Sequence, residues 1–184
     1  KRKRRTQPMP VAKAKTQVQL PEGIVEAVLV QVVDIGTHFS ERFKTKSRKV
    51  VLVWEIPSFL TSEDTPILIS KIYTLSISAK AALKRHVESL LGTSLKEKEF
   101  ELKNLLGTSA LLQLTKEEKN GKERVNITNV LKLPGDKKLE PVHDLISFDM
   151  SDLKIPEGVP EWIVDFIQKS EEYTGDLYAR YTRI

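Results

Sequence analysis

Cysteine is absent from the 184-residue chain, so disulfides, thiolate nucleophiles and cysteine-based zinc sites are excluded. The sequence also lacks a glycine-rich phosphate loop, a nucleophile-elbow pattern and any metal-ligand spacing. Its three histidines, His38, His86 and His143, are scattered along the chain. These absences predict a protein that is not an enzyme and that uses no metal or other cofactor.

Long apolar runs are also missing. The sequence has no run of about 18 apolar residues that could span a bilayer, and no apolar signal-peptide core follows the basic N-terminus. The lack of cysteine fits a reducing compartment. We therefore expect a cytoplasmic protein with no membrane partner.

Charge is distributed unevenly along the chain, although the net charge is only +5. Residues 1–49 contain twelve Lys and Arg against four acidic residues, whereas residues 134–184 contain eleven acidic residues against six basic ones. The basic front favours an anionic partner such as nucleic acid, and the acidic back would repel that partner or compete for the same groove. The alternative is that the asymmetry is only the uneven charge of many soluble proteins.

The composition divides the chain into three segments. Residues 1–20 begin KRKRR, contain seven basic residues and no acid, and are predicted to form a disordered basic arm. KRKRR is typical of a nuclear localisation signal and equally of a nucleic-acid-binding arm. Residues 21–134 are predicted to form the folded domain, and residues 135–184 an acidic wrapping segment followed by a helix and a tail.

The clearest structural pattern is a long antiparallel hairpin, formed by the apolar runs Val50–Ile56 and Ile67–Ile77 with a proline at each edge of the loop between them. The run Ile24–Ile35 before it predicts a long strand that ends at Gly36. Polar residues in that run do not keep one parity, which favours a bulge or a bend and a change of strand partner.

A second hairpin is predicted from Ser109–Thr115 and Glu123–Leu133, because Asn120-Gly121 between them is a strong turn signal. A short strand is also expected at Leu145–Phe148. The resulting order has one helix between the third and fourth of five main strands.

Two helices follow from apolar spacing. Ser78–Leu91 repeats its apolar residues at helical intervals and is followed by Gly92 as a stop. Pro160–Ser170 has proline in its first turn and places four apolar residues on one face: Trp162, Ile163, Phe166 and Ile167. That face predicts packing against the parent domain, with a partner surface as the alternative.

This order of elements predicts a mainly β fold with α-helix, a five-stranded OB-fold Greek-key barrel with a helix between strands 3 and 4 and a C-terminal helical extension. The ligand face of an OB-fold lies on strands 2 and 3, between the loops that join strands 1 to 2 and 4 to 5. Here those loops are predicted at Thr37–Lys49 and Lys116–Lys122.

Candidate binding residues gather at this face. Lys71 interrupts an apolar run, and since a buried unpaired ammonium is very costly, part of the face is expected to be wet. Bases are predicted to stack on Trp54 and Tyr73, and also on Phe39 or Phe43 unless these anchor the loop from beneath. For Trp54 and Tyr73 the alternative is core packing. It applies above all to Trp54, which shares parity with the apolar residues Val50, Leu52 and Ile56. The predicted phosphate contacts are Arg42, Lys44, Lys46, Arg48, Lys49 and Lys71 on one side, and Lys119, Lys122 and Arg124 on the other.

At these residues the sequence resembles the OB-fold single-stranded DNA-binding proteins encoded by tailed bacteriophages. The resemblance covers about Pro21–Pro134 and the PEWI helix near the end. The chain departs from the family at its ends, in the KRKRR arm and in the final ARYTRI, where an acidic run would favour a tail-mediated replisome contact. The segments that carry the resemblance are Val32–Thr37, Val51–Ile56, Ser70–Ser76, Asn104–Leu112 and Val125–Pro134.

The resemblance implies sequence-independent binding of single-stranded DNA during phage DNA replication or recombination, without catalysis and in the host cytoplasm. Replication or recombination proteins are then the expected protein partners. RNA in place of DNA is the alternative ligand. The alternative is an OB-fold protein-interaction module of a replication or structural assembly, in which the basic arm alone contacts nucleic acid.

Overall fold

The computed structural model describes residues 20, 22–96, 99–119, 121–135, 137–152 and 154–174. Nearly all of the predicted basic arm, residues 1–19, lies outside the described residues, as does the end of the tail, residues 175–184.

The described chain is mainly β with short helices, which confirms the predicted class and places α1 between the third and fourth strands. β6 is a sixth strand beyond the five main ones, and it falls within the predicted short strand. The elements are β1 (Gly23–Ser40), β2 (Thr45–Leu60), β3 (Pro66–Thr74), α1 (Ala82–Leu91), the 3-10 helix η1 (Leu102–Leu105), β4 (Ser109–Lys119), β5 (Lys122–Lys132), β6 (Ile146–Phe148) and α2 (Glu161–Gln168).

The strands form one sheet in the order β3-β2-β1-β4-β5, with antiparallel neighbours throughout this path. β6 lies off the path and pairs with β1 in parallel. Lys71 on β3 donates a hydrogen bond from its ammonium to the carbonyl of Ile127 on β5. The two outermost strands of the sheet order are therefore linked through a side chain.

β1 is buried on both faces, which explains why its apolar residues do not alternate with polar ones. Ala27 and Leu29 pack into one core, and Val28 and Val30 into a second core on the opposite face. The pairing of β1 with β2 shifts register after Leu29 and again after Asp34. The predicted bulge is confirmed, and β1 changes its other partner from β4 to β6 along its length.

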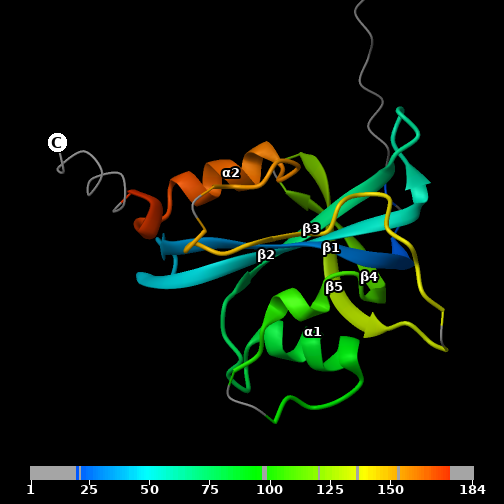
Figure 1. Cartoon of the computed structure of the whole chain (residues 1–184), viewed down its shortest axis with the longest axis horizontal. Helices are drawn as coiled ribbons and strands as arrows, with labels where there is room; N and C mark the ends of the chain where they lie inside the picture. Colours follow the sequence, from blue (N-terminus) through cyan, green and yellow to red (C-terminus); the bar gives the residue numbers. More distant parts are fainter. Residues whose placement is uncertain are drawn as a thin grey trace, which may run out of the picture.

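The two cores are covered by different helices, and Figure 1 shows α1 below the strands and α2 above them. The first core contains Trp54 and, from α1, Leu83 and Val87. The second core lies between the outer face of β1 and β2 and two isoleucines of α2, Ile163 and Ile167, both 0% exposed. The C-terminal segment therefore completes the fold by covering the outer face of β1 and β2.

α1 begins at Ala82, four residues after the predicted start, and ends at Leu91 as predicted. Gly92 takes a left-handed backbone conformation, φ 68°, and its N–H donates to the carbonyl of Glu88. Glycine adopts this conformation without the steric penalty of a Cβ, so the predicted stop is confirmed.

The wrapping segment is tied to β2 by a buried carboxylate. Glu55 is 0% exposed and accepts hydrogen bonds from the backbone N–H groups of Val142 and His143 and from His143 Nδ1, at 2.7 to 3.1 Å. Burial alone would raise the pKa of Glu55, but these hydrogen bonds outweigh it and lower that pKa below its ordinary value. The ionised carboxylate holds the segment against the sheet.

Candidate nucleic-acid interface

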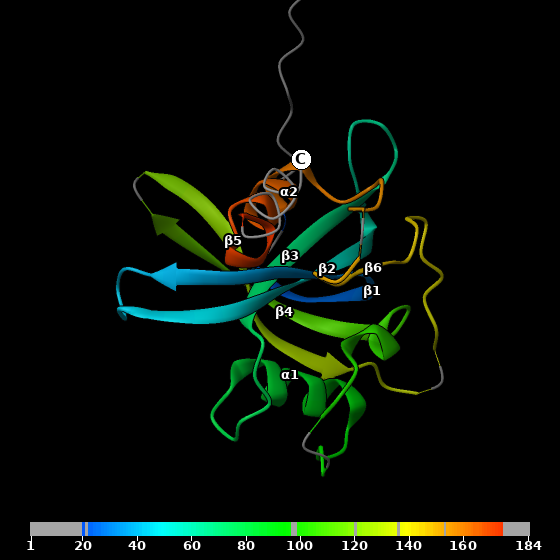
Figure 2. The same ribbon diagram turned by 60° about the vertical axis from the view of Figure 1, so that its left-hand side comes forward.

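Most of the predicted loop Thr37–Lys49 is β-ladder, so that prediction is wrong. β1 and β2 continue to pair from Gly36 with Lys49 to Ser40 with Thr45, and only residues 41–44 form a turn. We call residues 36–49 the basic hairpin. The basic hairpin and the β4–β5 hairpin both project to the left in Figure 2.

Gly36 does not end the strand as predicted, because it forms part of a bulge. Its φ is +74°, and the register of β1 against β2 shifts between Asp34 and Gly36. A Cβ at this position would lie 2.5 Å from the Cβ of Ser170, so only glycine fits against this serine, which lies two positions after the end of α2. The bulge lets the ribbon turn while its ladder continues.

The five cations predicted for the basic hairpin are all present on it, but most of them contact carboxylates. Lys44 Nζ lies 2.6 Å from Glu41, and Lys46 Nζ lies 2.6 Å from Glu171. Both pairs are largely exposed, and such pairs contribute only about 0 to 1 kcal/mol. Arg42 and Lys49 form no ion pair among the described residues. A phosphate could therefore replace the weakly held carboxylates without a large loss of stability.

Arg48 differs from the other four cations. Its guanidinium donates hydrogen bonds to the buried carboxylate of Asp34 and lies 3.6 Å from Asp149. The hydrogen bond with Asp34 raises the pKa of Arg48 above its ordinary value. Asp34 also accepts the backbone N–H of Gly36 at 2.9 Å. Arg48 thus stabilises the bulge, and any phosphate contact it makes would compete with this structural role.

Phe39 and Phe43 are exposed, at 49% and 67%, so neither anchors the hairpin from beneath. The guanidinium carbon of Arg42 lies 5.2 Å from the centre of the Phe43 ring. Exposed aromatic rings beside cations are the components of a single-strand binding surface. Of the two alternatives for these rings, the structure favours the exposed one.

Acidic residues after α2 contact the basic hairpin at its base. The Glu172 carboxylate accepts the Thr37 backbone N–H at 2.7 Å and the Thr37 hydroxyl at 2.6 Å. Burial alone would raise the pKa of Glu172, but the hydrogen bonds from Thr37 outweigh it and lower that pKa. The predicted competition of the acidic back with a nucleic acid is geometrically possible here, because Glu171 and Glu172 lie against the hairpin.

The indole of Trp54 is 0% exposed and lies in the first core. A ring with no accessible face cannot stack with a base, so the expectation that Trp54 binds nucleic acid is corrected to core packing. Its Nε1 has no hydrogen-bond partner within the described part of the chain.

Tyr73 is 3% exposed, and its hydroxyl lies 2.8 Å from His86 Nδ1 on α1. Burial raises the pKa of Tyr73 and, together with the charges of Lys71 and Arg85, lowers the pKa of His86 to about 4. Lys71 is half-buried, with its ammonium on the Ile127 carbonyl, and burial lowers its pKa. The stacking role predicted for Tyr73 is therefore wrong in this structure, and Lys71 already has a backbone partner.

The second predicted loop, Lys116–Lys122, is also mostly ladder, since β4 runs to Lys119 and β5 begins at Lys122. The side chains of Lys119 and Lys122 lie outside the described residues. Arg124 is exposed and pairs across the ladder with Glu117, and Lys116 forms a 2.7 Å ion pair with Glu123. The described part of this hairpin carries mixed charge, so the basic hairpin is the stronger candidate for phosphate contacts.

Two exposed aromatic side chains were not among the predicted site residues. Trp162 and Phe166 on α2 are each 39% exposed, and the ring of His38 on β1 lies 5.7 Å from that of Phe166. Helical spacing assigned them to the same face as Ile163 and Ile167, which are buried. The four residues of this face therefore differ in burial: the two isoleucines are buried, whereas the two aromatic residues are exposed. No signal in the sequence distinguishes the buried edge of the face from the exposed one.

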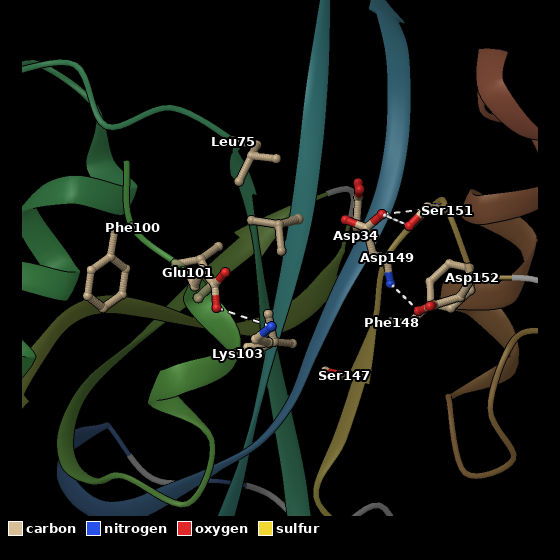
Figure 3. Close-up of a pocket in the computed structure, with 13 residues that line it drawn as sticks. Asp34, Leu75, Phe100, Glu101, Lys103, Ser147, Phe148, Asp149, Ser151 and Asp152 are labelled. Atoms are coloured by element: carbon tan, nitrogen blue, oxygen red, sulfur yellow. Dashed lines mark hydrogen bonds and ion pairs between the residues drawn. The ribbon is translucent and has the colours of Figure 1, made fainter. Parts of the chain in front are cut away.

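Figure 3 shows a cavity of about 580 Å³ between the base of the basic hairpin, η1 and the residues after β6. Four carboxylates line it: Asp34, Glu101, Asp149 and Asp152. Hydrogen bonds from the backbone and side chain of Ser151 lower the pKa of Asp149. A lining this acidic disfavours a phosphate, so the cavity is not part of the candidate interface.

Among the described residues no group of three His, Cys, Asp or Glu could hold a metal ion, and no helix is both long and apolar enough to cross a membrane. Comparison of the chain with protein-family models and with curated proteins gave no match.

Proposed function

We propose that this protein binds single-stranded DNA without sequence preference, through an OB-fold, and acts in DNA replication or recombination as the tailed-phage proteins that it resembles do. The observation that carries the proposal is the basic hairpin, which projects from the body and combines weakly paired cations with the exposed rings of Phe39 and Phe43. Cations that track a backbone, and rings that stack on its bases, bind a single strand regardless of sequence.

The sheet supports the OB-fold part of the proposal. Five strands follow the order β3-β2-β1-β4-β5, α1 lies between β3 and β4 in the chain, and the Lys71 contact links the outer strands. The proposed ligand surface differs from the predicted one in that it leaves out the buried residues Trp54 and Tyr73 of β2 and β3. The outer face of β1 and β2 is covered by α2, so the proposed contacts lie on the projecting hairpin.

Oligonucleotide binding should depend steeply on salt. Phosphate contacts release condensed counterions, so we expect the affinity for a fluorescent oligo-dT strand to fall at least about tenfold between about 50 and 200 mM salt, and duplex of equal length to bind more weakly. Fluorescence anisotropy measures both quantities. Deletion of residues 1–20 is the control: it should only weaken binding here, whereas loss of all binding would favour the protein-interaction module whose arm alone contacts nucleic acid.

The hairpin tip can be tested without disturbing the core. Arg42→Ala with Phe43→Ala should lower single-strand affinity by about tenfold or more, because one base stack contributes about 1 to 3 kcal/mol and a phosphate contact is lost as well. Since both residues are exposed, the free energy of unfolding should change by less than about 0.5 kcal/mol.

Two further variants serve as controls for the tip. Phe43→Tyr keeps an aromatic face and should keep most of the affinity. Arg85→Ala removes one positive charge from the exposed surface of α1, on the other side of the sheet, and should leave the affinity near that of the parent. Equal losses from the tip and from Arg85→Ala would show that binding follows net charge alone and would contradict the proposed location.

A further inference from the structure

α2 presents two aromatic rings that its own core does not need. Ile163 and Ile167 are 0% exposed and fill the second core with valines of β1 and β2. Trp162 and Phe166 belong to neither core and are each 39% exposed. Their exposed faces are therefore available to a ligand while α2 stays in place.

These rings continue the basic hairpin onto α2. The ring centres of Trp162 and Phe166 lie 6.0 Å apart at 88°, and those of Phe166 and His38 lie 5.7 Å apart at 66°. His38 pairs with Ser47 across the hairpin, and Ser47 stands between Lys46 and Arg48 in the sequence. Three rings thus run from a strand that carries phosphate-binding candidates to the helix beside it.

The edge of α2 that carries Trp162 and Phe166 has charged residues of both signs. Each residue turns an α-helix by about 100°, so residues three or four apart share a face. Lys169 therefore follows Trp162 and Phe166 along one edge, and it is exposed. By the same spacing Asp165 lies three residues after Trp162 and four before Lys169, so one carboxylate borders this edge beside the lysine.

We propose that Trp162, Phe166 and His38 form a stacking surface for the unpaired bases of a single strand, and that the basic hairpin holds the phosphates of the same strand. The inference rests on the proposed function and assigns its stacking residues. These three rings would stack with bases in place of Trp54 and Tyr73, which are buried. In this proposal α2 binds the strand and also covers the outer face of β1 and β2.

Trp162 provides a direct reporter, because the chain contains only two tryptophans and Trp54 is 0% exposed. A base that stacks on Trp162 should quench its fluorescence. In a titration of the full chain with oligo-dT, we expect the parent to lose tryptophan emission in step with the anisotropy of a labelled strand. The Trp162→Phe variant should still bind but lose most of that quenching, because only the buried Trp54 then emits.

Affinity gives a second measurement that does not depend on fluorescence. Trp162→Ala with Phe166→Ala should weaken oligo-dT binding by about tenfold or more, in line with the loss of one or two base stacks. Val142→Ala is the matched control, because Val142 is an apolar residue of the wrapping segment that is 68% exposed. The Val142→Ala variant should bind oligo-dT with the affinity of the parent. Circular dichroism of each variant establishes that α2 and the sheet are retained.

Quenching that persists in Trp162→Phe would overturn the inference, as would a folded double variant that binds like the parent. If the double variant keeps its affinity but has a lower mass than the parent by light scattering, the rings are an interface between copies of this chain. If the parent itself shows no binding of oligo-dT at low salt, the proposed function fails first. The two failures are thus distinguished in one set of titrations.

Discussion

Replacing Trp54 with alanine is expected to lower the free energy of unfolding by about 3 to 5 kcal/mol and to leave the oligonucleotide affinity of the folded protein unchanged. The indole is 0% exposed and lies in the first core, so truncation loses its transfer free energy and leaves a cavity. Chemical denaturation followed by circular dichroism measures the first effect, and anisotropy titration in the cold measures the second.

Trp54→Phe is the matched control, because it keeps an aromatic ring in the core and removes the Nε1 that has no partner among the described residues. It should lose clearly less stability than Trp54→Ala. A Trp54→Ala protein that is nearly as stable as the parent, but binds a single strand much more weakly, would return this residue to the ligand surface and contradict the structure.

The sequence alone determines most of the elements but not which face of the central hairpin meets water. Both parities of β2 are apolar: Leu52 and Trp54 pack into the first core, and Val51 and Val53 into the second. Periodicity cannot show which of two apolar faces is open. The cover of the second face comes from α2, about a hundred residues later, and local patterns do not encode that docking.

The basic hairpin shows a second limit of local patterns. Residues 37–49 are polar and charged, which is typical of a loop, yet they continue the ladder of β1 and β2. A ribbon that is exposed on its sides has no apolar alternation to reveal it. Gly36 has the same ambiguity, because a glycine after an apolar run can end a strand or form a bulge, and here Ser170 packs where its Cβ would be.

The strength of the candidate cations as phosphate ligands depends on partners distant in sequence. Arg48 is held by the buried Asp34, and Lys46 by Glu171. A count of charges treats these two residues as equal. Their partners make Arg48 a structural cation and leave Lys46 weakly held at the surface.

The remaining large effect concerns the attachment of α2. We expect Ile163→Ala to lower the free energy of unfolding by about 2 to 5 kcal/mol, because the side chain is 0% exposed and packs among buried residues of β1 and β2. α2 should unfold together with the sheet, so denaturation followed by circular dichroism and by Trp162 emission, in a Trp54→Phe background, should give coincident transitions.

Val164 offers a control on the same helix, because it is only half-buried and lies outside the second core, so Val164→Ala should lose less stability than Ile163→Ala. A Trp162 transition well before that of the sheet, with a small effect of Ile163→Ala, would describe α2 as a detachable lid. The outer face of β1 and β2 would then be free to meet a strand, and Val51 and Val53, rather than the rings of α2, would lie against its bases. Coincident transitions keep α2 in place and leave the basic hairpin and the exposed flank of the helix as the surface that a single strand can reach.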